Sequence, residues 1–123
     1  MVNKEVQVPN LGEPKMPYDS SNLAIISKFK PIKDEDKLHI YWVLPYCENE
    51  YKTRPLKYFS HLYGHEGENS LLSYLKKEGY ALSLSAGGRH EMGVFSSFDV
   101  IITLTKKGLE NYEKVLEAVF KYA

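Results

Sequence analysis

The sequence predicts a two-layer α+β fold, with a mainly antiparallel sheet of about four strands and helices packed on one face of that sheet. Three observations favour this class. Apolar stretches with a period of two residues, typical of strands, occur in adjacent pairs along the chain. Stretches with helical spacing lie between and after these pairs. The 123 residues, 43% of them hydrophobic, suffice for one core and are too few for two ordinary domains.

The amino-terminal residues predict an extended, linker-like segment. They are mostly polar, contain Pro9, Pro14 and Pro17, and have no hydrophobic period. We therefore divide the chain into a linker-like segment over residues 1–21 and part of one α+β domain over residues 22–123. The chain ends within a predicted helix at Ala123, which favours a truncated domain of a larger protein.

The first pair of strands is expected over residues 22–30 and 38–44, and the two could form a hairpin. The first contains LAIISKF and ends before Pro31. The second alternates between apolar residues on one face and mixed residues on the other. The residues on its apolar face are Leu38, Ile40, Trp42 and Leu44.

Two short helices are expected next. Pro55 suits a first helical turn, because its missing N–H would have no helical partner there. The apolar residues Leu56, Phe59, Leu62 and Tyr63 follow at helical spacing. The second helix has Asn69 or Ser70 as its cap and ends near Gly79, where a left-handed residue is typical. Its inward-facing residues are Leu71, Leu72 and Leu75.

The second pair of strands is expected over residues 80–86 and 94–104, joined by a flexible glycine-rich connection over residues 87–93. The apolar face of the longer strand comprises Phe98, Val100, Ile102 and Leu104. Thr105 can cap a final helix. The apolar stripe of that helix comprises Leu109, Tyr112, Leu116, Val119 and Phe120.

Composition argues against several partners and compartments. Sixteen Lys and Arg balance sixteen Asp and Glu, so the surface gives no reason to expect a nucleic acid or an anionic membrane as partner. No apolar run approaches the length of a membrane span. Cys47 is the single cysteine and cannot form an internal disulfide, which favours a reducing compartment such as the cytoplasm.

The histidines of HLYGHEGENS, residues 61–70, are the residues that most suggest a metal site. Four positions apart on a helix, His61 and His65 would face the same way and could share a metal. Peptidases of the inverted zinc class write H-x-x-E-H, with the glutamate as base. Here Gly64 takes that place, and Glu66 follows the second histidine on a different face. We favour packing or hydrogen bonding at a helix end over ligand contact or a metal site, and assign no catalytic and no metal residue.

The same segment carries a resemblance to a known family. YFSHLYGHEGENSLLSYLKKEGYALSLSAG, residues 58–87, resembles the second domain of the insulinase or pitrilysin family of zinc metallopeptidases, the family of insulin-degrading enzyme. The phrase G-H-E-G-x-x-S-L-L, from Gly64 to Leu72, is specific in combination. The P-I-K at 31–33, the YWVLP at 41–45 and the stretch FDVIITLTKKGLENYEKVLEAVFKYA at 98–123 are similar to the same family.

The resemblance implies a parent protein that is a zinc metalloendopeptidase, built as a clamshell of four homologous α+β domains around a chamber. Zinc and its motif belong to the first of these domains. The present chain aligns with the second, where the zinc motif has decayed. The resemblance therefore implies no cofactor and no peptide hydrolysis in this chain alone.

The resemblance also implies a binding role, in which the second domain anchors the amino-terminal end of a peptide by adding it as a strand to a sheet edge. Carried over by alignment, the peptide-binding residues are His61, Gly64 and Glu66 at the helix end and Leu84, Ala86 and Gly88 on the strand. Glu66 could pair with a free α-ammonium group. Ala86 and Gly88 depart from the family's residues, which is tolerable if backbone groups make the contacts.

The expected partners are a peptide substrate and the other domains of the parent chain, with self-association into a homo-oligomer left open. Two other functions compete with peptide anchoring. One is an inactive structural homologue, resembling the core subunits related to processing peptidases. The other is a small independent metal-binding module that uses His61 and His65.

Overall fold

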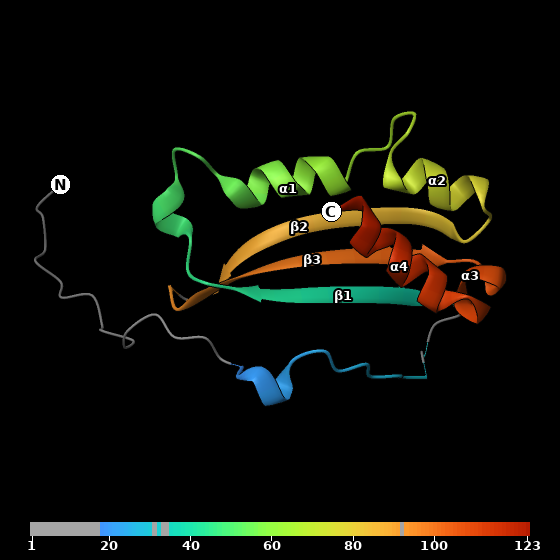
Figure 1. The fold of residues 1–123 in the computed structure, drawn as a ribbon, viewed down its shortest axis with the longest axis horizontal. Coiled ribbons are helices and arrows are strands. Elements are labelled where there is room, and N and C mark those ends of the chain that lie inside the picture. Colours follow the sequence, from blue (N-terminus) through green and yellow to red (C-terminus); the bar gives the residue numbers. More distant parts are fainter. Residues whose placement is uncertain (1–17, 31, 33–34, 92) are drawn as a thin grey trace, which may run out of the picture.

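A three-stranded antiparallel sheet with helices on one face forms the centre of the molecule (Figure 1). The structure is a computed structural model that describes residues 18–30, 32, 35–91 and 93–123. The elements, in chain order, are η1 Ser20–Asn22, β1 Lys37–Leu44, η2 Glu48–Glu50, α1 Pro55–Tyr63, α2 Leu71–Lys77, β2 Ala81–Glu91, β3 Phe95–Leu104, α3 Lys106–Glu110 and α4 Tyr112–Tyr122. The predicted α+β class with an antiparallel sheet is confirmed.

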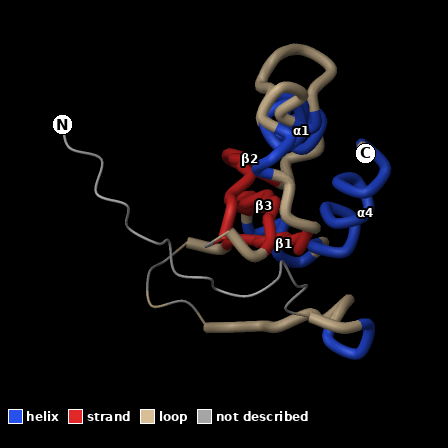
Figure 2. Tube along the Cα trace, turned by 90° about the vertical axis from the view of Figure 1, so that its left-hand side faces the viewer, coloured by secondary structure: helices blue, strands red, loops and turns tan. Residues whose placement is uncertain are grey.

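The sheet has the order β1-β3-β2, so β3 is its central strand. β1 pairs with β3 from Lys37↔Thr103 to Leu44↔Ser96, and β2 pairs with β3 from Ala81↔Leu104 to Glu91↔Phe95. Both outer strands therefore have an edge that no strand of the described residues covers. Figure 2 shows α1 and α4 on the same side of the sheet, as the sequence predicts.

The core lies between this sheet face and the helices, and it confirms the alternation predicted for β1 and β3. Every second residue of β3 from Phe98 to Leu104 is buried, and the matching residues of β1 pack against the same cluster. The most deeply buried apolar residues are Leu75, Val100, Ile102, Val115 and Val119. At roughly 25 cal/mol per Å² of apolar surface, this cluster is the main stabilising term of the fold.

The predicted helix boundaries are largely confirmed by the caps. Pro55 is at the start of α1, the Ser70 side chain accepts a hydrogen bond from Ser73 N, and the Thr105 side chain accepts one from Gly108 N. Each of these hydroxyl oxygens accepts a hydrogen bond from an amide N–H that has no partner within its own helix. Gly79 has φ +72°, the left-handed conformation expected after α2.

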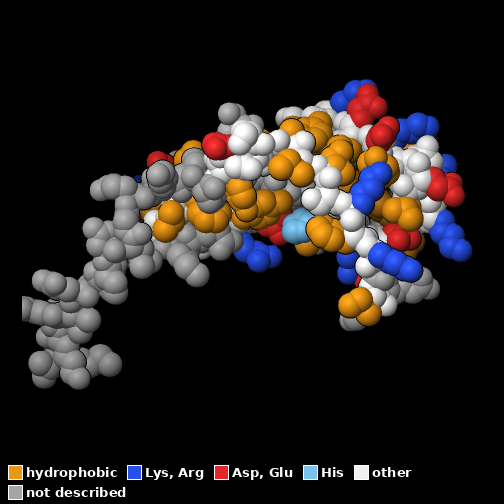
Figure 3. Space-filling view, turned by 90° about the horizontal axis from the view of Figure 1, so that it is seen from below, with side chains coloured by type: hydrophobic (Ala, Val, Ile, Leu, Met, Phe, Trp, Pro, Cys, Tyr) orange, Lys and Arg blue, Asp and Glu red, His pale blue; other side chains and the backbone are white. Residues whose placement is uncertain are grey.

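The strand predicted over residues 22–30 is wrong, so the described residues form three strands where about four were expected. The segment is irregular and exposed, and Ala24 has φ 57°, which interrupts an extended chain. Figure 2 places it apart from the sheet, and the Lys28 ammonium group lies 4.7 Å from the centre of the Tyr112 ring. Its apolar residues Leu23, Ile25, Ile26 and Phe29 stay exposed. Figure 3, which views the molecule from below relative to Figure 1, shows hydrophobic side chains at the surface.

The flexible connection predicted over residues 87–93 is also wrong for most of its length. β2 continues to Glu91, and Gly87 and Gly88 pair with Asp99 and Phe98 of β3. Both glycines remain in the strand because they pair with β3, and Gly88 also packs against Leu56 of α1. Of the linker-like segment predicted over residues 1–21, residues 1–17 lie outside the described residues, and η1 begins at Ser20.

The final helix differs from its prediction in two ways. It is divided into α3 and α4 at Asn111, whose φ of −117° is not helical. The buried positions of α4 are Val115 and Val119, whereas Leu109 and Phe120 of the predicted stripe are exposed. Because of this break, the buried face of α4 is rotated relative to α3, and the apolar residues of the two helices do not follow one continuous helical spacing.

Candidate functional site

The two histidines of the decayed zinc motif lie at the carboxyl end of α1, where the helix stops between them. His61 is in the last turn, α1 ends at Tyr63, and His65 follows Gly64. Their ring centroids are 6.0 Å apart and both side chains are exposed. They share no helical face, because His65 is already beyond the helix.

Gly64 is the residue that ends α1, and the local geometry explains why a glycine stands there. Its amide donates to the Ser60 carbonyl at 2.9 Å. A Cβ built on Gly64 would lie 2.7 Å from that same carbonyl oxygen. A glutamate at this position would therefore strain the helix end.

Glu66 lies in the loop between α1 and α2, with an exposed side chain. The loop is tight at the next residue, because a Cβ on Gly67 would lie 2.5 Å from the Nε2 atom of His65. The carboxylate of Glu66 is exposed to solvent in this loop, one residue after His65. His61, Gly64 and Glu66 are thus brought together at one end of the helix.

The three strand residues of the predicted site lie on β2, on the face that the helices cover. Leu84 is buried, Ala86 is partly buried, and Gly88 packs closely under α1. A Cβ on Gly88 would lie 2.6 Å from the Cβ atom of Leu56, so glycine permits the approach of α1 to the strand. α1 runs alongside β2 in the opposite direction (Figure 1). The two halves of the predicted site therefore lie on neighbouring elements.

The outer edge of β2 is open among the described residues, since its only strand partner is β3. In an antiparallel ladder, successive residues direct their N–H and C=O groups to opposite edges. Every second residue of β2 therefore presents a donor and an acceptor outward. The side chains along this stretch are small, because it reads Ser85, Ala86, Gly87 and Gly88.

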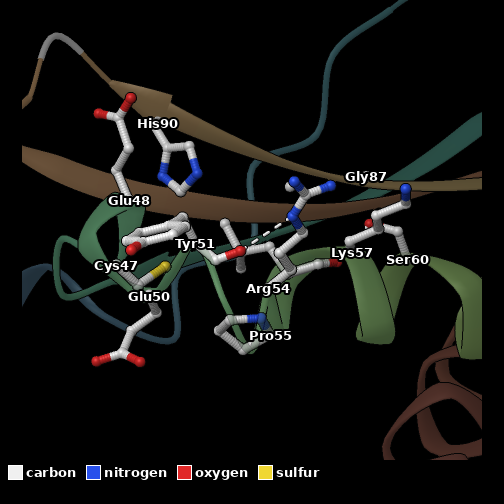
Figure 4. A pocket seen from close by; sticks show the side chains of 12 residues that line it. Cys47, Glu48, Glu50, Tyr51, Arg54, Pro55, Lys57, Ser60, Gly87 and His90 are labelled. Carbon is white, nitrogen blue, oxygen red and sulfur yellow. Dashed lines mark hydrogen bonds between the residues drawn. The ribbon is translucent and has the colours of Figure 1, made fainter.

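A groove of about 480 Å³ lies where β2 passes the beginning of α1 (Figure 4). Of the six predicted site residues, only Gly88 lines it. The other lining residues are Cys47, Glu48, Glu50, Tyr51, Arg54, Pro55, Leu56, Lys57, Ser60, Gly87 and His90. The groove was not predicted from the sequence, because its walls come from two segments that are far apart along the chain. The only hint was the dense charge of ENEYKTR, residues 48–54, before α1.

One wall of the groove is fixed by the Ser96 hydroxyl, which is fully buried. The Cys47 amide donates to Ser96 Oγ at 3.0 Å, and the Cys47 thiol lies 3.3 Å from the same oxygen. His90 Nδ1 is 2.9 Å from that oxygen. These contacts attach the η2 segment to the β2–β3 hairpin, so the groove has a defined shape.

A buried charge lies on the opposite face of the sheet. Asp99 is only 6% exposed, and its Oδ2 atom is 3.4 Å from Arg89 Nη2 and 3.7 Å from His39 Nε2. The three residues come from β3, β2 and β1, so this cluster links all three strands. We assign it a structural role.

The part of the chain that the structure describes offers neither a metal centre nor a membrane span. There, no group of three or more His, Cys, Asp or Glu side chains is arranged to hold a metal ion. Within the same residues, no helix has the length and apolar character needed to cross a bilayer.

Comparison with known proteins agrees with the fold and the motif. A family model described as "Peptidase M16 inactive domain" matches residues 4–123. The chain is 38% identical to nardilysin of Rattus norvegicus over 127 aligned positions that cover 94% of this chain. It is 38% identical to insulin-degrading enzyme of Drosophila melanogaster and 39% identical to A-factor-processing enzyme of Saccharomyces cerevisiae, over 98% and 99% of this chain.

These relatives are much longer, and the chain spans only 11%, 12% and 12% of their lengths, respectively. A crystal structure of pitrilysin matches 72% of this chain and 10% of its own with a TM-score of 0.67, which at 22% identity shows the fold alone. The family match covers nearly the whole chain and the relatives align over almost all of it. The chain therefore belongs to the insulinase family of peptidases and represents part of its inactive M16 domain.

Proposed function

We propose that this domain anchors the amino-terminal part of a peptide on the free edge of β2, and that it forms part of the chamber wall of a zinc metallopeptidase whose zinc is bound by another domain. The domain itself holds the peptide and does not cut it. The observation that carries this proposal is the edge of β2 that no strand of the described residues covers, which is flanked by α1 and lined with small side chains. An edge strand of this kind accepts an extended peptide through main-chain hydrogen bonds.

The polar end of the proposed site is at the carboxyl end of α1. Glu66 is exposed there and can accept hydrogen bonds from an α-ammonium group, while His61 lies in the last helical turn before it. A peptide that begins at Glu66 and follows β2 from Leu84 toward Gly88 would use all six residues of the predicted site. Its side chains would alternate between the helix face and the opposite face.

The test of anchoring compares a peptide that has a free amino terminus with its acetylated twin, titrated against the full-length gene product that contains this chain. We expect acetylation to weaken binding about 2- to 5-fold, the scale of one solvent-accessible charge pair. Glu66→Gln should remove this difference. Glu68→Gln is the matched control, because it removes the same charge from the same exposed loop. Equal affinities of the twins for the unaltered protein would contradict an ammonium anchor and favour a structural homologue.

The test of strand addition uses two peptides that are N-methylated at alternate residues in opposite registers. A peptide added to an edge bonds to it through every second residue. One methylated register should therefore bind much more weakly than the other. Equal loss in both registers, or no loss in either, would rule out β2 as the anchoring edge.

A further inference from the structure

The groove at the beginning of α1 continues the open edge of β2, because Gly87 and Gly88 belong to both. It is at the opposite end of α1 from Glu66. A peptide that follows β2 beyond Leu84 therefore reaches this groove. A role for the groove in binding such a peptide rests on the proposed anchoring function and extends it to the side chains of the peptide.

The charges of the groove favour an acidic occupant. Arg54 and Lys57 extend from the start of α1 toward the strand that carries Gly87 (Figure 4). Neither has an acidic partner within 4.0 Å in the described part of the chain. Arg54 uses one donor, since its Nε atom donates to the Tyr51 carbonyl at 3.0 Å, and its guanidinium group keeps further donors for a ligand.

The two glutamates of the groove do not neutralise these cations. Glu48 accepts a hydrogen bond from the Tyr46 hydroxyl, and Glu50 accepts one from Thr53 Oγ1 at 3.3 Å. Figure 4 shows both carboxylates directed away from the two cations, on opposite sides of the groove. The part of the groove around Arg54, Lys57 and Gly87 is therefore positive, whereas the end of the groove near His90 carries the Glu48 carboxylate.

The length of α1 determines which residue of the peptide meets these cations. The helix has nine residues and is about 13 Å long, at about 1.5 Å per residue. An extended chain covers that length in about four residues, at about 3.3 Å each. If the first residue of the peptide lies opposite Leu84 on β2, its fifth residue lies opposite Gly88 at the groove, and its first, third and fifth residues face the same side.

We propose that the groove formed by Arg54, Lys57 and the edge of β2 at Gly87 and Gly88 is a carboxylate subsite, which selects peptides that carry an aspartate or glutamate about five residues from their free amino terminus. Its occupant is a side chain of the peptide anchored on β2. The fourth residue of that peptide faces the opposite side of the strand, so the subsite distinguishes an acidic fifth residue from an acidic fourth residue.

The experiment titrates four peptides of otherwise identical neutral sequence against the full-length gene product. Three of them have glutamate, glutamine or lysine as the fifth residue, and the last has glutamate as the fourth residue instead. Exposed charge pairs contribute on the order of 2- to 5-fold each, so two cations should favour glutamate over glutamine at the fifth residue by about 4- to 25-fold.

The other two peptides test charge and position separately. The peptide with lysine as its fifth residue should bind more weakly than the glutamine peptide, because the cations of the groove repel it. The peptide with glutamate as its fourth residue should bind like the glutamine peptide, because that side chain faces away from the groove. The preference for a fifth-residue glutamate should shrink as salt is raised.

Substitutions in and near the groove test whether its cations cause the preference for a glutamate as the fifth residue. Lys57→Gln should reduce it about 2- to 5-fold, whereas Lys52→Gln should leave it unchanged, because Lys52 lies in the preceding turn and does not line the groove. Arg54 supports its own loop through Tyr51, so the charge swap is made at Lys57 instead. Lys57→Glu should reverse the preference toward the peptide with a fifth-residue lysine.

The titrations distinguish failure of the anchoring proposal from failure of the subsite proposal. If acetylation weakens binding while the two glutamate peptides and the glutamine peptide bind equally, the subsite is overturned and the anchoring stands. A preference for a fifth-residue glutamate that survives both Lys57→Gln and Lys57→Glu also overturns the subsite. If Lys57→Glu abolishes that preference but the acetylated twin binds equally, the ammonium anchor is overturned and the groove is retained.

Discussion

Gly88 and Gly87 are adjacent residues of β2 for which the structure predicts opposite effects of the same substitution. A Cβ at position 88 would lie 2.6 Å from Cβ and 3.0 Å from Cδ1 of Leu56. A Cβ at position 87 would meet no atom of the described residues within 4 Å. Gly88→Ala must therefore displace α1 from the sheet, whereas Gly87→Ala adds a methyl group in open space.

The magnitudes follow from these two environments. Overpacking of this kind costs about 1 to 3 kcal/mol of unfolding free energy. Gly87→Ala should instead stabilise by about 0.4 to 1 kcal/mol, because alanine restricts the unfolded chain. Urea unfolding followed by circular dichroism measures both. With a denaturant slope of about 1 to 3 kcal/mol per M, Gly88→Ala should lower the midpoint by roughly 1 M.

The comparison of the two variants has a clear contrary result. If Gly88→Ala is as stable as Gly87→Ala, the close contact between α1 and β2 is absent in solution. The groove and the proposed peptide edge would then have a different shape. A changed slope for either variant would point to an altered unfolded state and not to the contact.

Two further predictions concern stability. Burial, with a smaller contribution from the charge of Tyr122, raises the pKa of Tyr63 above its ordinary value of 10.0. The neutral phenol therefore contributes its full share to the free energy of unfolding below pH 10, and this share is lost as pH rises through the folded-state pKa. Tyr63→Phe should flatten the alkaline part of a curve of unfolding free energy against pH; an unchanged curve would contradict the burial of this phenol. Ser70→Ala should lower the free energy of unfolding by about 1 kcal/mol, because the amide of Ser73 loses its capping oxygen. Ser70→Asn should keep most of this free energy. The urea midpoints of both variants would show whether the loss in Ser70→Ala comes from the missing cap or only from the loss of a polar group.

The elements that could be predicted from sequence are those determined by local chemistry. The alternation of apolar residues placed β1 and β3 with the correct face inward. Thr105 marked one helix start and Asn69 or Ser70 another, and in the structure the hydroxyls of Thr105 and Ser70 accept hydrogen bonds from helix amides. These features depend on neighbours within a few residues. They need no knowledge of the rest of the fold.

The errors concern elements that depend on distant partners. Residues 22–30 have the composition of a strand, but a strand forms only where its backbone pairs with another strand, and this segment pairs with neither outer strand of the described sheet. Gly87 and Gly88 read as a loop, because glycine is disfavoured in strands, but the contact with Leu56 makes glycine the residue that fits at position 88. Neither partner can be identified from periodicity.

The histidine motif illustrates the same division within the candidate site. The sequence alone showed that the glutamate between His61 and His65 is replaced by Gly64, which argued against catalysis. The structure adds that α1 ends at Tyr63, so the helix that would place both histidines on one face is interrupted there. A side chain at position 64 would approach the carbonyl of the preceding turn. Restoring the carboxylate would thus not restore a zinc site, because the helix that would align such a site ends at Tyr63 and His65 lies in the loop beyond it.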